Sequence, residues 1–317
     1  MPLNHLLAIG FTEGFKYSPL IVGATLLFRL GHYPDLGIEG SFLAGGAVAA
    51  LCSQHQYGWF VGLLLACFTG AVVGAITGSL YQYCRINSLL SGIATSYVVY
   101  STVYVVLKYT DAIAVPIFFS SSNTVVATIL ICLSATIFFS SRLGMLCRFS
   151  GESPNLVRQL HLEPKTYICI ILIFGNLIVA FGGWMRVHVA GSFSMNVFSS
   201  NVYMCLIAMI LGDSIVSLLI STVRIALQPL RRLSRRSVSS SARHTDLAVL
   251  GSVPIIMSGV VGSIAYWVVY EMCTGTRLIP SGDLTFAVLG VGAAAVLVLT
   301  KTVSRGRAPL GSWRFLD

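Results

Sequence analysis

Apolar runs of membrane-spanning length recur along the whole chain and restrict what it can fold into. A helix needs about 17–25 mostly apolar residues to cross the hydrocarbon core of a bilayer. Nine runs approach or reach that length. They are Leu6–Phe28, Leu36–Cys52, Trp59–Leu80, Leu89–Leu107, Val125–Phe139, Tyr167–Trp184, Val202–Ile220, Leu247–Tyr270 and Leu284–Leu299. The sequence therefore predicts an all-α polytopic membrane protein with nine spans, or eight to ten, because the fifth run is short and the second is open to interruption.

The charge distribution orients these spans. Charged residues make up only 10% of the chain, against about 25% in soluble domains. The net charge of +9 comes from three basic segments. These hold Arg142, Arg148, Arg158 and Lys165; Arg231, Arg232, Arg235, Arg236 and Arg243; and Lys301, Arg305, Arg307 and Arg314. Loops rich in Lys and Arg stay in the cytoplasm. Two spans separate each segment from the next, so we expect all three, and the C-terminus, on the cytoplasmic side, and no nucleic acid partner.

Motifs for chemistry within the chain are absent. The sequence has no GxxxxGK[ST] phosphate loop, no HExxH metal motif and no GxSxG nucleophile elbow. None of the eight cysteines forms a CxxC pair, so we interpret them as small apolar residues and expect no metal site. The chain is thus predicted to be a single transmembrane domain, 1–317, without enzymatic activity or a cofactor of its own.

A polar segment between two apolar runs, residues 142–166, carries a helix start signal. Ser153 is suited to be an N-cap, and Pro154 follows at the first helical position, where its missing N–H costs nothing. Pro164 is expected to close this helix about three turns later. Leu156, Val157 and Leu160 would give the helix one apolar side.

Two interpretations of this cytoplasmic helix remain open. It either receives force from a cytoplasmic ATPase or lies on the lipid surface. Arg148 and Arg158 would bind carboxylates of the partner in the first case and lipid headgroups in the second. The other basic segment, 230–246, is rich in serine and is predicted to be a cytoplasmic loop.

Charges inside the apolar runs are few. Glu13 and Lys16 are three residues apart and are expected either to pair on one helix face or to line a transport path. Asp213 lies deep in the seventh run without a charged neighbour in sequence, so it must face protein or water. It is interpreted as a hydrogen-bonding junction between helices or as part of a conduit or gate.

Gly70, Gly74 and Gly78 fall on one face of the third run. This spacing lets helices approach closely, and we favour packing within the chain over a dimer interface.

The stretch RLGHYPDLGIEGSFLAGGAVAA (29–50) resembles the second membrane segment of permease subunits of bacterial ABC importers, of the branched-chain amino acid type and its tryptophan/tyrosine-type relatives. The matching residues are Pro34, Asp35, Leu36, Glu39, Gly40 and Ser41. Asp35 and Glu39 would also stabilise the start of a helix, which is an alternative explanation for them.

The family's cytoplasmic loop and its late Gly-acidic pair have counterparts too. These are Leu143, Gly144, Arg148, Gly151, Glu152 and Asn155, and later Gly212 and Asp213. The chain departs from the family where Arg231–His244 looks inserted and where Tyr81–Asn87 matches loosely.

The resemblance implies a permease in the bacterial inner membrane that forms the translocation pathway for a small polar solute, most plausibly an amino acid. Its implied partners are a cytoplasmic ABC ATPase that binds ATP and Mg, an extracytoplasmic solute-binding protein, a second permease copy and membrane lipid. The alternative is an ion- or proton-coupled secondary transporter with Glu13, Lys16 and Asp213 as coupling groups; a membrane-embedded enzyme trails both.

Two sets of residues follow from this interpretation. The residues expected to couple to the ATPase are Arg148, Gly151, Glu152, Ser153, Pro154, Asn155, Leu156, Val157, Arg158 and Leu160. The residues expected in the path or gate are Glu13, Lys16, Asp35, Glu39 and Asp213.

Overall fold

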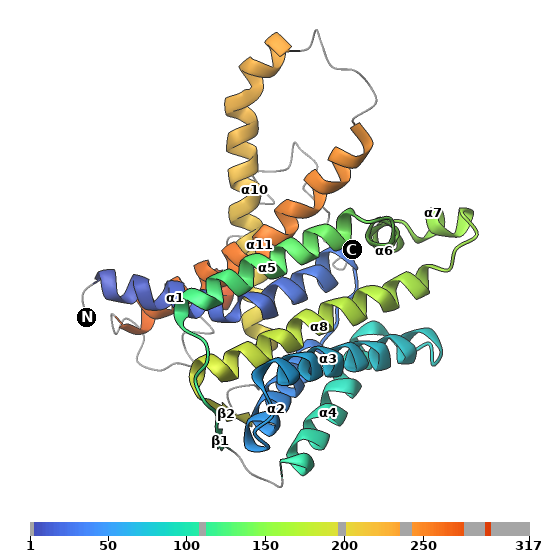
Figure 1. Cartoon of the computed structure of the whole chain (residues 1–317). Helices are drawn as coiled ribbons and strands as arrows, with labels where there is room; N and C mark the ends of the chain where they lie inside the picture. Colours follow the sequence, from blue (N-terminus) through green and yellow to red (C-terminus); the bar gives the residue numbers. More distant parts are fainter. Residues whose placement is uncertain (1–2, 108–111, 196–200, 235–242, 276–288, 293–317) are drawn as a thin grey trace.

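The computed structural model describes residues 3–107, 112–195, 201–234, 243–275 and 289–292. Helices dominate these residues (Figure 1), as the periodic apolar runs predict. The elements are α1 (Leu3–Thr25), η1 (Leu26–Leu30), α2 (Ile38–Gln54), α3 (Trp59–Gln82), α4 (Ser88–Val106), β1 (Ala112–Ala114), α5 (Ser121–Ser140), α6 (Arg142–Glu152), α7 (Pro154–Gln159), α8 (Pro164–Ala190), β2 (Ser192–Ser194), α10 (Asn201–Ser234) and α11 (Arg243–Gly275).

The prediction of an all-α polytopic membrane protein is confirmed. Among the described residues, six helical segments are long and apolar enough to cross a membrane: Trp59–Gln82, Ser88–Val106, Asn123–Ser140, Pro164–Ala190, Asn201–Ile220 and Val253–Gly275. The first two predicted spans correspond to α1 and α2. Helix α2 has only 17 residues, and α1 carries Glu13 and Lys16. Most of the ninth predicted span, Leu284–Leu299, lies outside the described residues.

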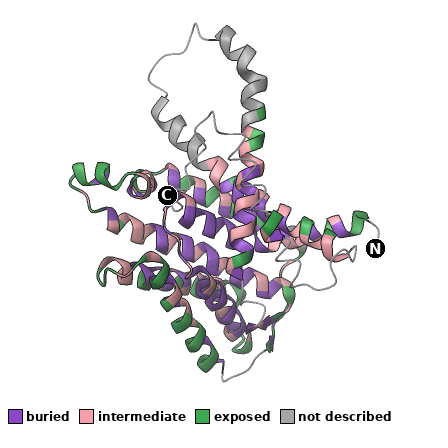
Figure 2. Ribbon diagram, turned by 180° about the vertical axis from the view of Figure 1, so that it is seen from behind, coloured by how far each residue is buried: buried purple, intermediate pink, exposed green. Residues whose placement is uncertain are grey.

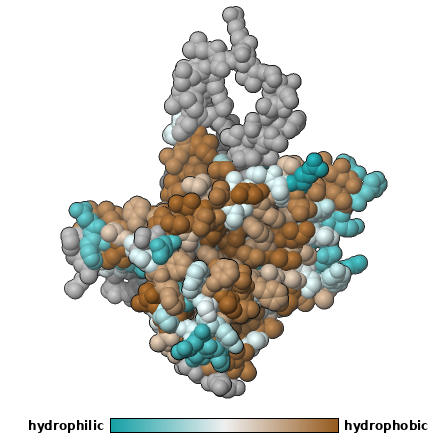
Figure 3. Space-filling model, viewed as in Figure 1, coloured by the Kyte–Doolittle hydropathy of each residue, from teal (hydrophilic) through white to brown (hydrophobic). Residues whose placement is uncertain are grey.

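Helices α1 and α8 form the centre of the bundle. Helix α1 packs against α11, α8 and α5, while α8 packs against α3, α2 and α1. Buried residues therefore concentrate on these helices, as Figure 2 shows. Leu20, Phe42, Leu172 and Trp184 are among the fully buried core side chains. The face seen in Figure 3 is largely hydrophobic, with hydrophilic side chains gathered at its extremities, as expected of helices that face lipid.

The connection between α1 and α2 is irregular. Helix α1 widens into the single π-helical stretch η1, and the Gly31 N–H closes it on the Leu26 carbonyl at 2.9 Å. His32 then takes a positive φ of 47°, and the chain reaches α2. A π-helical turn shifts the face that the following side chains present, and such turns are frequent at functional sites.

The segment predicted to be cytoplasmic, residues 142–166, differs from its prediction. It contains two helices, α6 and α7, and Pro164 begins α8 where it was expected to close the loop helix. The break falls at Ser153, which has φ −148° and makes no side-chain cap, because the residue before a proline is pushed out of the helical region. Pro164 fits a helix start for the same reason as Pro154, since neither has an N–H to leave unsatisfied.

Two further features complete the described structure. Strands β1 and β2 form an antiparallel ribbon in which Ala112 pairs with Ser194 and Ala114 with Ser192, a pairing that the sequence did not predict. Helix α10 continues to Ser234 and α11 begins at Arg243, so the predicted basic loop 230–246 starts and ends in helix. Residues 235–242 lie outside the described residues.

Candidate functional site

Asp213 is paired with an arginine from the other end of the chain. The guanidinium Nη2 of Arg29, on η1, lies 2.9 Å from a carboxylate oxygen of Asp213, on α10. Both side chains are only 12% exposed. The two groups form a close ion pair. A charge at membrane depth needs such a partner, so the pair explains how Asp213 is accommodated.

Sequence reasoning missed Arg29 as the partner. Arg29 directly follows the first apolar run, and sequence reasoning assigned it no role beyond being the first residue of the stretch 29–50. One signal in the sequence could have identified the pair. Asp213 is the only acidic residue of α10 and needs a basic partner, and Arg29, the last charged residue of the first helix, is a candidate of opposite charge. The π-helical geometry of η1, which sets where Arg29 points, has no marker in the sequence.

Asp35 and Asn176 form a second buried polar cluster. One carboxylate oxygen of Asp35 accepts the Gly37 N–H at 2.7 Å, and the other accepts the Asn176 side-chain amide at 2.9 Å. The Asn176 carbonyl accepts the Ser41 hydroxyl at 2.6 Å. All three side chains are fully buried. Asp35 therefore joins the start of α2 to the middle of α8 and does not itself line an open space. Asn176, the lone amide of its apolar run, was also missed.

The start of α2 is tied to α4 as well. The Tyr33 hydroxyl lies 2.7 Å from the Ser91 hydroxyl, and the Ser96 hydroxyl donates to the Leu36 carbonyl at 2.9 Å. Glu39, in the first turn of α2, is partly buried. The segment between η1 and α2 is thus a junction, hydrogen bonded to both α4 and α8.

Glu13 and Lys16 pair with each other on α1, three residues apart and partly buried. The structure does not bring them into the Arg29–Asp213 pair or the Asp35 cluster in any hydrogen bond or ion pair among the described residues.

Helix α6 is docked onto η1. A side chain at Gly151 would place its Cβ 2.6 Å from the Gly31 carbonyl oxygen and 3.0 Å from that of Leu30, so only glycine permits this approach. Cys147 is buried on the same side, and burial raises the pKa of its thiol to about 12. Arg148 and Glu152 form an i,i+4 ion pair at 2.9 Å.

Helix α7 exposes apolar residues to its surroundings. Leu156 and Leu160 are 46% and 57% exposed, whereas Val157 is fully buried. At about 100° per residue the three fall within an arc of about 100°, as expected of one apolar side, but only Val157 points inward while the two leucines are exposed. Exposed polar neighbours surround the leucines: Ser153, Asn155 and Arg158.

The glycines of α3 face α8. A Cβ at Gly70 would overlap Ala180, and one at Gly74 would overlap the Leu172 carbonyl. At Gly78 it would come 2.9 Å from the Cys169 sulfur. These three glycines thus lie in a helix crossing within the chain.

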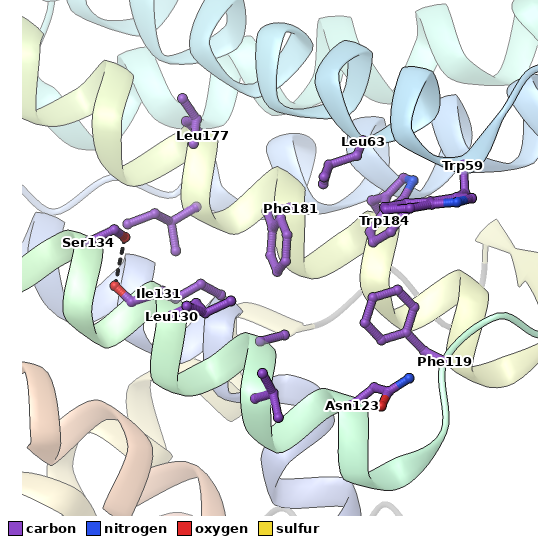
Figure 4. A pocket seen from close by; sticks show the side chains of 13 residues that line it. Trp59, Leu63, Phe119, Asn123, Leu130, Ile131, Ser134, Leu177, Phe181 and Trp184 are labelled. Atoms are coloured by element: carbon purple, nitrogen blue, oxygen red, sulfur yellow. Dashed lines mark hydrogen bonds between the residues drawn. The ribbon is translucent and has the colours of Figure 1, made fainter.

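A groove of about 570 Å³ opens between α3, α5 and α8 (Figure 4). Trp59, Trp184 and Phe119 gather at one end, and Leu177 and Ser134 lie toward the other. The lining is almost wholly apolar, and the Ser134 hydroxyl is already bonded to the Ile131 carbonyl. Such a groove suits an apolar occupant and offers little to a polar solute.

Comparisons with known proteins agree with this architecture. A family model described as "Branched-chain amino acid transport system / permease component" matches residues 7–274. The chain is 21% identical over 211 residues to a "Tyrosine transport system permease protein" of Clostridioides difficile (strain R20291), covering 63% of this chain and 70% of that protein. It is 26% identical over 201 residues to an uncharacterised protein of Rickettsia prowazekii (strain Madrid E), covering 61% and 71%. No solved structure matches the chain.

Proposed function

The chain belongs to the family of permease components of branched-chain amino acid transport systems, and we propose that it forms the translocation pathway of an ATP-driven importer for a small polar solute, an amino acid. The relative named as a tyrosine transport permease supports an amino acid as the solute class. In this proposal the protein resides in the bacterial inner membrane with its C-terminus in the cytoplasm. It does not hydrolyse ATP, and Mg-ATP binds to a separate ATPase subunit.

The observation that carries the proposal is a continuous set of contacts from the cytoplasmic helices to the buried ion pair. Exposed Leu156 is on α7 and exposed Leu160 caps its C-terminal end; α7 follows α6 directly. Gly151 of α6 contacts the backbone at the end of η1, and η1 carries Arg29. Movement of α6 would therefore shift η1 and change the distance between Arg29 and Asp213. An ATPase that pushes on α7 would have a physical route to the membrane interior.

The predicted coupling residues take distinct parts in this proposal. Leu156, Leu160 and Arg158 would contact the ATPase, because they are exposed at the tip. Ser153, Pro154 and Asn155 set the position of α7, and the Arg148–Glu152 pair stiffens α6. Gly151 and Val157 transmit the displacement through their buried contacts.

The path residues divide in a similar way. Asp213 with Arg29 would act as the gate, and Asp35 would hold the α2 start to α8. Glu39, and Glu13 with Lys16, would border the path from α2 and α1. An extracytoplasmic binding protein would deliver the solute, and a second permease copy would complete the pathway within the lipid bilayer.

The buried ion pair is also compatible with the alternative, an ion- or proton-coupled transporter, because ionisable residues inside the membrane serve as coupling groups in such proteins. Uptake of radiolabelled tyrosine and leucine into right-side-out vesicles separates the two. We expect uptake to require internal ATP and the binding protein, and to persist when ionophores dissipate the proton and sodium gradients. Uptake that follows those gradients and ignores ATP would support the secondary transporter.

A further inference from the structure

Helix α4 is packed on one side and exposed on the other. Ser91, Gly92, Thr95 and Val103 are buried toward α2 and α3, with which α4 makes its main contacts. The rest of the helix is largely exposed, as Figure 2 shows at the edge of the bundle. The residues on this exposed side therefore indicate whether it faces lipid or water in the membrane.

In the second half of α4, one exposed strip carries hydroxyl groups. Tyr97, Tyr100, Ser101 and Tyr104 are all exposed, and at about 100° per residue they fall within an arc of about 100°. We call these four residues the hydroxyl strip. The neighbouring exposed residues Val98 and Val105 lie on an adjacent, purely apolar face.

The Tyr97 hydroxyl is unsuited to lipid because of its depth. Tyr97 is 71% exposed and sits halfway along a 19-residue span, about 13 Å from either end. A tyrosine side chain is too short to bring its hydroxyl from there to the headgroups. An unpaired hydroxyl in hydrocarbon is strongly unfavourable. The Tyr97 hydroxyl therefore calls for water or a polar solute beside it.

Tyrosine differs in this respect from serine and threonine. The Ser101 hydroxyl donates to the Tyr97 carbonyl at 2.9 Å, and Thr69 of α3 donates to the Leu65 carbonyl at 2.7 Å. Short hydroxyls thus satisfy themselves within their own helix and tolerate lipid. The phenol of Tyr97 is carried too far from its own backbone to do so, and it makes no hydrogen bond among the described residues.

We propose that the hydroxyl strip of α4 lines the aqueous translocation path and contacts the solute as it passes. Helix α4 contains no charged residue, so the strip would offer hydroxyls and aromatic rings without a fixed charge. That lining suits a small neutral or zwitterionic solute, which it would bind weakly and release. Ser91 and Ser96 tie α4 to the η1–α2 junction, so the strip would move with the Arg29–Asp213 gate.

This inference rests on the proposed transport function, and its test keeps the two apart. Exposed Cys84 is first replaced by serine, and ATP-driven amino acid uptake is measured in that background. Absence of ATP-driven uptake there would overturn the transport function. If uptake is present, Tyr97→Cys and Val98→Cys are compared; Val98 is 64% exposed at the same depth and serves as the matched control.

A positively charged, membrane-impermeant methanethiosulfonate distinguishes the two positions. We expect it to modify Tyr97→Cys at least about tenfold faster than Val98→Cys, because a reactive thiolate forms only in water. Modification of Tyr97→Cys should abolish most of the uptake, and excess solute should slow the reaction. Equal rates, or full uptake after modification, would overturn the inference while leaving the transport function intact.

Tyr97→Phe provides a second measurement that does not depend on labelling. It keeps the ring and removes the hydroxyl, so we expect unchanged thermal stability and a lower rate of uptake. If oxidation cross-links Tyr97→Cys between two copies while the reagent fails to modify it, the strip is a dry dimer contact and the inference is wrong.

Discussion

The guanidinium of Arg29 lies 2.9 Å from the carboxylate of Asp213, joining the π-helical end of the first helix to the membrane-spanning part of α10. Each residue compensates the other's charge in a site that is almost closed to its surroundings. Removing one partner of such a pair is more harmful than removing both, because the remaining charge stays buried. The single variants of Arg29 and Asp213 are therefore expected to be less stable than the double variant.

Asp213→Leu is expected to destabilise the protein by about 3–5 kcal/mol, because the largely buried guanidinium of Arg29 then loses the carboxylate beside it. Arg29→Leu with Asp213→Leu should recover most of that stability while uptake remains low. Thermal unfolding in detergent and uptake in vesicles measure the two effects. A double variant that transports as well as the unmodified protein would show that the pair has no part in gating.

Gly74→Leu is expected to lower stability by at least about 1–3 kcal/mol, since a side chain there overlaps the Leu172 backbone and forces α3 away from α8. Val72→Leu, on the exposed side of the same helix, is the control and should leave the melting temperature unchanged. Equal melting temperatures for the two variants would contradict the close crossing.

Leu156→Asp combined with Leu160→Asp should uncouple transport. Both leucines are exposed, so the variant should insert and fold, yet it should lose ATPase association and ATP-driven uptake. Gln159→Glu adds a charge to the same helix without removing an apolar residue and should retain both activities. If the ATPase still binds the double variant and responds to solute, α7 is not the coupling element and the lipid-surface interpretation gains support.

Native cysteines report the orientation of the cytoplasmic side. Cys84 is exposed in the turn after α3, so a membrane-impermeant maleimide should label it in inside-out vesicles and not in right-side-out ones. The opposite result would invert the predicted topology.

Cys147 should stay unlabelled in the same experiment. Burial raises the pKa of its thiol to about 12, so the reactive thiolate is scarce below that pH. Raising the pH from about 6 to about 9 should therefore leave it unreactive until the protein is denatured. Ready labelling of folded protein, quantified by mass spectrometry, would show that α6 detaches from η1.

The sequence predicted the helices better than it predicted their partners. Apolar runs placed α3, α4 and α8 closely, because burial in lipid acts on every residue of a span. The pairing of Arg29 with Asp213, and of Asp35 with Asn176, joins residues far apart in the chain, and local periodicity carries no record of it. The boundary at Ser153 was correct because proline acts locally, whereas the inward turn of Val157 depends on contacts made only after folding.

The β1–β2 ribbon has a consequence for the proposed contact with an extracytoplasmic binding protein. Ile113 and Phe193 stand opposite each other and are both buried, so the ribbon is anchored to the bundle. It fastens the connection between α4 and α5 to the connection between α8 and α10. Where the strands pair, residues 112–114 and 192–194 are therefore held together. In the proposed importer, a binding protein that contacts this ribbon would therefore act on α4 and α8 together.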